Sequence, residues 1–206
     1  YSSVYCKIIT TKTISTQQEF YNLAQGIVTS EKNVIYNLTN NLDFKDFVWK
    51  DATKPDQFVG TFNGNGYTIS NININTAIPK QANIFYKVTD GTIFNVNFEN
   101  ISIVNTASSA KLVGIVGAMN GGYISNINIK NITSKAVGQA SGSVGGLVGQ
   151  IINGNNFIDY ITLVNDENQE ISCTNKYVAG IVGNIQLDSN MPQAAVYISY
   201  CVVKSD

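Results

Sequence analysis

A short unit recurs along this chain, and the recurrence limits the folds that the chain can adopt. Aligned on its first Ile, the unit begins at Ile69, Ile93, Ile124, Ile158 and Ile198. Apolar residues return three positions later, at Ile72, Val96, Ile127, Ile161 and Cys201, and five positions later, at Ile74, Phe98, Ile129, Leu163 and Val203. Self-similarity of this kind, with connections of varying length, is typical of a solenoid.

The first half of each unit also aligns. Its apolar column is Phe62, Phe85, Val116, Val148 and Val182, and two positions earlier stand Gly60, Asn83, Gly114, Gly146 and Gly180. The apolar segments are too short, and the turns too rich in Gly and Asn, for the unit to consist of helices. We therefore expect short strands.

The apolar positions change parity between Ile69 and Ile72, so the chain must bend at Asn71 to keep both side chains inside. Stacked coils with a corner there predict an internal column of the reference Ile residues and a structural ladder of corner amides at Asn71, Asn95 and Asn126. Tyr160 and Tyr200 replace Asn in the last units. Because parallel crossovers are right-handed, the predicted fold is an all-β, right-handed parallel β-helix.

The N-terminal part differs from the repeat. Thr16 and Glu19 fit a capping box, and apolar residues follow at helical spacing, which predicts one short helix over 17–26 that covers the N-terminal end of the solenoid. We expect a single domain over 1–206, with an N-terminal strand, the cap helix and a first coil in 1–57, and about five repeat coils in 58–206. The chain begins at Tyr1 without a signal peptide, so we expect a fragment of a longer protein.

Composition excludes several classes of function. The chain has no His, and all 13 of its basic residues are Lys, so no imidazole or guanidinium chemistry is available. The net charge of −1 carries no basic cluster for nucleic acid, and no apolar run reaches the roughly 20 residues that span a bilayer. Cys6, Cys173 and Cys201 show no metal-ligand spacing and are compatible with one disulfide or with buried thiols. We expect no cofactor, no metal and no catalytic residue.

Several segments carry a family resemblance. FVGTFNGNGYTISNININ at 58–75, SVGGLVGQ at 143–150, VAGIVGN at 178–184 and the opening ISTQQEFYNLAQGI resemble the GLUG-motif repeats of large surface proteins. Such repeats occur in bacterial and protist surface adhesins and beside the catalytic domain of IgA-specific metallopeptidases. Asn83–Phe85 and 157–163 depart from the pattern. The resemblance implies a parallel β-helix region in a cell-surface or secreted protein.

The function predicted from these observations is a non-catalytic extracellular structural or adhesive module. Its partners would be host or matrix glycans, proteins, or neighbouring copies. The alternative is an accessory, substrate- or glycan-binding segment of a secreted peptidase or polysaccharide-degrading enzyme. The connections at 105–111, 133–143, 165–176 and 184–196 are the expected partner-contacting surface.

Some polar positions could have further roles. Asn37, Asn100 and Asn131 begin N-x-S/T sequons and are candidate glycosylation sites. Glu99 and Lys130 are expected to pair across coils at the solvated surface. An outward column of Asn73, Asn97 and Asn128 could face a glycan or an ice lattice, and the acidic run 166–170 could hold a cation or simply be a solvated loop.

Overall fold

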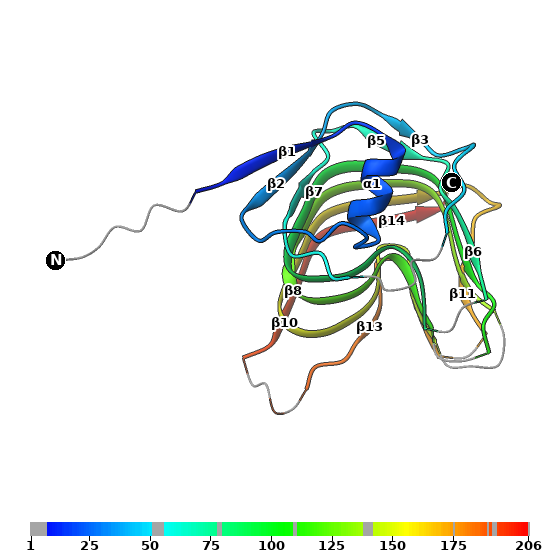
Figure 1. Cartoon of the computed structure of the whole chain (residues 1–206). Coiled ribbons are helices and arrows are strands. Elements are labelled where there is room, and N and C mark those ends of the chain that lie inside the picture. The colour runs from blue at the N-terminus through cyan, green and yellow to red at the C-terminus, as the bar shows by residue number, and fades with distance from the viewer. Residues whose placement is uncertain are drawn as a thin grey trace.

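The chain forms a parallel β-solenoid of about four turns with one short helix. The structure is a computed structural model that describes residues 8–50, 56–77, 80–108, 111–137, 142–174, 176–188, 190 and 193–205. Viewed along the solenoid axis, successive coils lie over one another (Figure 1). With α1 toward the viewer, the chain turns clockwise as it recedes, which is the expected right-handed sense.

Every pairing between the described strands is parallel, and the main path through the sheet is β1-β2-β4-β7-β8-β10-β13. The elements are β1 (Thr10–Ile14), α1 (Gln17–Ala24), β2 (Val34–Leu38), β3 (Leu42–Asp43), β4 (Thr61–Asn63), β5 (Thr68–Ser70), β6 (Asn73–Thr76), β7 (Lys80–Asn105), β8 (Lys111–Ala136), β9 (Gly142–Gly145), β10 (Val148–Asn165), β11 (Ile171–Cys173), β12 (Lys176–Ala179), β13 (Val182–Ile185) and β14 (Ala195–Ser205).

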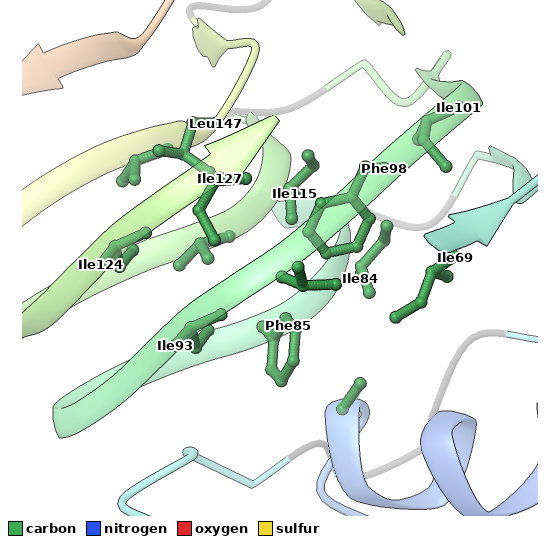
Figure 2. Close-up of a cluster of buried hydrophobic side chains, with 14 of the residues drawn as sticks. Ile69, Ile84, Phe85, Ile93, Phe98, Ile101, Ile115, Ile124, Ile127 and Leu147 are labelled. Carbon is green, nitrogen blue, oxygen red and sulfur yellow. The ribbon is translucent and has the colours of Figure 1, made fainter. Parts of the chain in front are cut away.

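The predicted internal columns hold over most of the solenoid. Ile93 pairs with Ile124, and the column continues through Ile158 to Ile198. The second column runs through Phe85, Val116, Val148 and Val182. Figure 2 shows Ile93 and Ile124 projecting from adjacent coils into the apolar interior. Because each coil covers the apolar face of its neighbour, stability comes mainly from stacking.

The prediction that Ile69 and Phe62 open these two columns is wrong. Phe62 pairs with Ile93, while Ile69 pairs with Phe98 and, on its other side, with Leu42. The misalignment begins before the turn at 64–67, because β4 lies on Thr92–Phe94 and Phe62 therefore takes the position of the reference Ile. Gly64 N–H donates to the Phe94 carbonyl before this turn, and Asn97 N–H donates to the Tyr67 carbonyl after it. The four residues of the turn thus stand opposite two residues of β7, and this shift places Ile69 opposite Phe98.

Helix α1 closes the N-terminal end, as predicted. Thr16 Oγ1 accepts the Glu19 N–H at 3.2 Å, and Glu19 Oε2 accepts the Thr16 N–H at 3.1 Å, so the capping box is present. The fully buried Phe20 ring lies 5.5 to 5.9 Å from the rings of Phe44, Phe62 and Phe85. The helix ends at Ala24, two residues before the predicted end, and Gly26 follows with a positive φ of 64°.

The long strands β7, β8 and β10 continue around corners of the coil. Corner residues have positive φ, and they include Asp90, Asn95, Asn100, Gly122, Asn126, Asn131, Gly154 and Tyr160. Gly122, at φ 119°, leaves no room for a side chain because a Cβ there would overlap the carbonyl oxygen of Gly91 on the preceding coil. Close stacking therefore requires glycine at this corner.

The last coil is covered on one side only. Ile158 and Leu163 are 0% and 1% exposed, whereas Ile198 and Val203, their partners in β14, are 42% and 52% exposed. These β14 residues occupy core columns, and no further described strand covers them. The apolar interior is thus sealed at the α1 end and open at the β14 end.

Candidate functional surface

Asn95 and Asn126 form consecutive steps at one corner of the solenoid. Their φ values are 58° and 50°, and the Asn126 Nδ2 donates to the Asn95 Oδ1 at 3.0 Å. Asn tolerates the left-handed backbone region better than other residues with side chains. Tyr160 and Tyr200, both at φ 51°, occupy the same corner on the next two coils. The structure therefore brings two of the three predicted ladder residues together.

Asn71 lies at a different corner. Ser70 pairs with Glu99 and the Asn71 N–H donates to the Glu99 carbonyl, which places Asn71 beside Asn100 and separates it from Asn95. The Asn71 Nδ2 donates to Asp43 Oδ1 at 2.8 Å, and this hydrogen bond is the main cause of the lowered pKa of Asp43. Because Ile69 lies on Phe98 and not on Ile93, Asn71 takes the position of Asn100.

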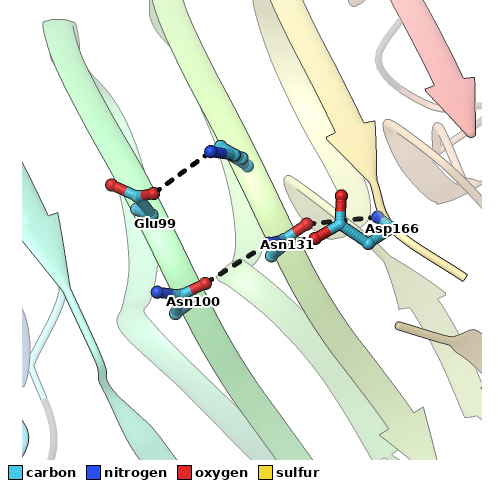
Figure 3. A network of polar contacts seen from close by, with 5 residues as sticks. Glu99, Asn100, Asn131 and Asp166 are labelled. Atoms are coloured by element: carbon cyan, nitrogen blue, oxygen red, sulfur yellow. Dashed lines mark hydrogen bonds and ion pairs between the residues drawn. The ribbon is translucent and has the colours of Figure 1, made fainter. Parts of the chain in front are cut away.

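Asn100 and Asn131 stack at this second corner, within a polar network that runs along the solenoid (Figure 3). Asn131 Nδ2 donates to Asp166 Oδ2 at 2.7 Å and to Asn100 Oδ1 at 3.4 Å, and the Asp166 N–H donates to Asn131 Oδ1 at 3.1 Å. The amide of Asn131 therefore ties three coils together. A glycan attached to its Nδ2 would remove at least one of these bonds.

The other sequon residue, Asn37, lies within β2, where its Oδ1 accepts a hydrogen bond from Asn63 Nδ2 at 3.1 Å. Glycosylation of Asn37, Asn100 and Asn131 stays a prediction. Asn100 and Asn131 do occupy equivalent positions, because Glu99 pairs with Lys130 and Ile101 with Ile132.

The charged groups near this corner form exposed pairs. Lys130 Nζ lies 3.5 Å from Glu99 Oε1, and an exposed pair of this kind contributes less than about 1 kcal/mol. Lys135 Nζ lies 2.6 Å from Glu170 Oε2, and this contact is the first cause of the lowered pKa of Glu170. Within the described ranges, no three His, Cys, Asp or Glu residues are grouped to hold a metal ion.

The expected outward amide column is only partly present. Asn128 Nδ2 donates to Asn97 Oδ1 at 2.8 Å, and Asn97 Nδ2 donates to the Gly66 carbonyl at 2.7 Å. Asn73 pairs instead with Ser102, and Thr68 stands opposite Asn97. Asn97 and Asn128 are bonded to each other along the solenoid, so the array spans two coils and one N–H group of each amide is in use.

An exposed set of aromatic side chains follows the outer surface of the C-terminal coils. We call it the aromatic strip and define it as Tyr123, Phe157, Tyr160, Tyr197 and Tyr200. Phe157 pairs with Tyr123 on one side and with Tyr197 on the other. The rings of Phe157 and Tyr197 are stacked with centroids 4.9 Å apart, and those of Tyr160 and Tyr200 are stacked at 4.8 Å. The strip thus occupies one outward column and the adjacent corner.

The strip is fixed by hydrogen bonding as well as by stacking. Tyr123 Oη donates to Asp159 Oδ2 at 2.7 Å, and this bond is the main cause of the raised pKa of Tyr123. On the preceding coils the same outward column carries Thr61 and Thr92. Aromatic character is therefore confined to the later coils.

Sequence reasoning identified Tyr160 and Tyr200 only as replacements for a corner Asn, and it missed the rest of the strip. The signal was present: the residues immediately before the reference Ile are Thr92, Tyr123, Phe157 and Tyr197. Alignment by apolar columns identifies inward positions, so it does not identify this outward column as a surface.

A shallow hollow lies beside the strip, with a volume of about 490 Å³. We call it the amide hollow, and its lining residues are Gln150, Ile152, Asn153, Gln186, Leu187 and Asp188. Gln150 Nε2 donates to Gln186 Oε1 at 2.9 Å, and the Asp188 N–H donates to Asn153 Oδ1 at 2.8 Å. The hollow therefore joins β10 to the segment that follows β13.

The connections expected to contact partners are shorter than predicted. Residues Ile171–Cys173 form β11, which pairs with Ser134–Ala136 of β8. Most of the described residues in 133–143 and 165–176 therefore belong to the strands of the coil and not to connections. Positions 109, 110, 138–141, 175, 189, 191 and 192 lie outside the described residues. The amide hollow includes the start of the fourth connection, at 186–188.

The cysteines do not form a candidate site. Cys201 Sγ donates to the Ser199 carbonyl at 3.2 Å, and partial burial raises the pKa of this thiol. Cys173 packs against the apolar core, and Cys6 lies outside the described residues. In the part of the chain that the structure covers, no helix has the length and apolar character needed to cross a membrane.

Comparison with known proteins supports the fold. No family model matches the chain. A segment of 140 residues, 67% of this chain, is 29% identical to halomucin of Haloquadratum walsbyi (strain DSM 16790 / HBSQ001), and the chain covers 1% of the length of that protein. The fold is similar to the crystal structure of "a putative immunoglobulin A1 protease from Bacteroides ovatus", with a TM-score of 0.60 and 18% identity, covering 94% of this chain and 67% of the other.

Proposed function

We propose that the chain is a non-catalytic extracellular module with a structural or adhesive role in a surface or secreted protein. The observation that carries this proposal is the stacked solenoid, whose apolar columns are filled while its outer columns present amide and aromatic side chains. A rigid scaffold with variable outer positions is suited to contact with other molecules. Similarity to halomucin, a protein named as a mucin, supports a surface location.

The second candidate is an accessory segment of a secreted peptidase or polysaccharide-degrading enzyme. It is favoured by the structural similarity to a protein described as an immunoglobulin A1 protease, which extends over 94% of this chain. The chain itself has no His and so cannot form an HExxH zinc site. Under this candidate, catalysis would belong to another part of the full-length protein.

Localisation of the full-length gene product tests the first proposal. Antibodies raised against residues 1–206 should label intact native cells or the surrounding medium, and external protease should remove the label from intact cells. Antigen confined to the cytoplasm would contradict an extracellular role. A peptidase or glycan-hydrolase motif elsewhere in the full-length sequence, with matching activity in the purified protein, would favour the second candidate.

A further inference from the structure

The aromatic strip offers ring surface that the fold leaves uncovered. Tyr160, Tyr197 and Tyr200 are 57%, 57% and 72% exposed, and Phe157 and Tyr123 are 39% and 37% exposed. Large apolar groups gathered on one surface commonly mark an interaction site. Tyr is especially suited to an interaction site because its ring is rigid and apolar while its hydroxyl remains solvated.

The amide hollow continues this surface around the corner at Gly154. Asn153 and Phe157 belong to the same strand and are four positions apart, which corresponds to at most about 13 Å of extended chain. Gln186 is held beside β10 because its N–H donates to the Ile151 carbonyl at 2.8 Å. The hollow and the strip are therefore adjacent segments of β10 on either side of one corner.

The polar groups of the hollow are neutral amides with more than one hydrogen-bonding position. The bond from Gln150 to Gln186 uses one of the two N–H groups of the first amide and the oxygen of the second. Each amide therefore retains capacity for a hydroxyl-bearing ligand. Hydroxyl groups can both donate to and accept from such amides.

The charged groups at this surface favour an uncharged ligand over an anionic one. The carboxylates at this surface are Asp159, which accepts from Tyr123 Oη, and Asp188, which accepts from Asn190. None of the residues that define the strip or the hollow is Lys. A polyanion or an anionic lipid surface would meet like charge here without a compensating cation.

From these observations we infer that the aromatic strip and the amide hollow together bind an uncharged polysaccharide. The apolar C–H face of a sugar ring would pack on the faces of the Tyr197 and Tyr200 rings that point away from Phe157 and Tyr160, and the sugar hydroxyls would bond to the amides of Gln150, Asn153 and Gln186. This inference rests on the proposed extracellular role and specifies the class of ligand.

Affinity electrophoresis of the purified 206-residue chain tests the inference. Native gels would contain dextran, mannan or xylan as neutral probes, and alginate or heparin as anionic probes. At least one neutral probe should retard the protein, while the anionic probes should not. The double variant Tyr197→Ser/Tyr200→Ser should bind the retarding probe about tenfold more weakly, since it removes two ring contacts.

The matched control is Tyr177→Ser in β12, a Tyr that is 50% exposed and lies outside the strip. It should bind as the unsubstituted chain does. Gln186→Ala tests the hollow separately and should weaken binding without changing the stacked rings. Circular-dichroism spectra of all variants would show that the solenoid is intact, and sedimentation would show that no variant changes the association of the chain with itself.

The inference is overturned if no neutral probe retards the protein, if only anionic probes do, or if the double variant binds like the control. A change in self-association without a change in polysaccharide binding would also overturn it, in favour of a contact between copies. These outcomes are separable from the proposed function. If the protein is found at the cell surface but does not bind polysaccharide in the gels, the extracellular role stands and only the assigned ligand is wrong.

Discussion

At the scale of single residues, the corners decide whether adjacent coils can stack. Asn126 holds a left-handed backbone at φ 50° and also donates its amide to Asn95. A residue with a Cβ and no compensating side-chain bond is disfavoured in this region by roughly 1–2 kcal/mol. Glycine adopts the same conformation without strain.

We therefore expect Asn126→Ala to lower the free energy of unfolding by about 1–2 kcal/mol, and Asn126→Gly to lower it less. Urea denaturation followed by circular dichroism would measure both. The control is Asn128→Ala on the same strand, which loses an amide bond of similar length but has no positive φ. Equal losses for Asn126→Ala and Asn126→Gly would show that backbone conformation is not the cause.

The interior is sensitive to charge at single positions. Ile127 is fully buried and pairs with Val96 and Ile161 on the two neighbouring coils. Ile127→Asp should lower the free energy of unfolding by about 4 kcal/mol or more, since a buried unpaired carboxylate has no partner there. Thermal denaturation would measure the loss, with the outward Asn128→Asp as control. A melting curve unchanged by Ile127→Asp would contradict the assigned core.

The residue pattern predicted the corner at Asn95 and Asn126 because the apolar positions change parity there. It misplaced Asn71 because Ile69 was taken as the equivalent of Ile93, whereas Phe62 lies on Ile93 and Ile69 lies on Phe98. The outward aromatic column repeats with the same spacing as the core columns, but its side chains do not pack in the interior. Burial restricts inward positions to apolar residues, whereas outward positions accept many residue types, so their pattern is harder to recognise in the sequence.

At the scale of elements, α1 depends on its N-terminal cap. Glu19 accepts hydrogen bonds from the N–H groups of Ser15 and Thr16, and the bond from Ser15 is the largest cause of its lowered pKa. A carboxyl whose pKa is lower in the folded state stabilises the fold above its unfolded pKa. That contribution is lost as the pH falls through the folded value.

Stability should consequently decline as the pH falls below the ordinary Glu pKa of 4.5, in part through this cap. Glu19→Gln should reduce the acid dependence while lowering stability at neutral pH by less than about 1 kcal/mol, because Gln can still accept the N–H bonds and only the charge is lost. Urea titrations at several pH values would measure the difference, with the exposed Gln18→Ala as control. An acid dependence unchanged in Glu19→Gln would assign the effect to other carboxyls.

The sequence predicted α1 well because a capping box and a helical apolar spacing coincide within a few residues. It did not predict β11, which lies in a connection assigned to the surface. Ile171 and Cys173 lie against the core, but the strand is only three residues long and lacks a matching apolar column in the repeat. Short strands of this kind are fixed by their neighbours, here Ser134–Ala136, more than by their own sequence.

At the scale of the whole molecule, protection should vary along the solenoid axis. β7 and β8 have a neighbouring strand on both sides, whereas β14 pairs only with β10 among the described strands. We expect amide hydrogens of β8 to exchange much more slowly than those of β14. Hydrogen exchange with mass spectrometry would measure this gradient, and equal protection of β8 and β14 would contradict it.

The parallel hydrogen bonds of the solenoid point along its axis, which has a mechanical consequence. A tensile load applied between the two ends would stretch these bonds directly, and rupture would start at the seam with the fewest of them. The register between β7 and β8 is long, whereas the N-terminal coils are joined, among the described strands, only through Ile35–Asn37 of β2 on β4 and Leu42–Asp43 of β3 on β5. Under load the molecule would yield from its N-terminal side while the middle coils stay folded.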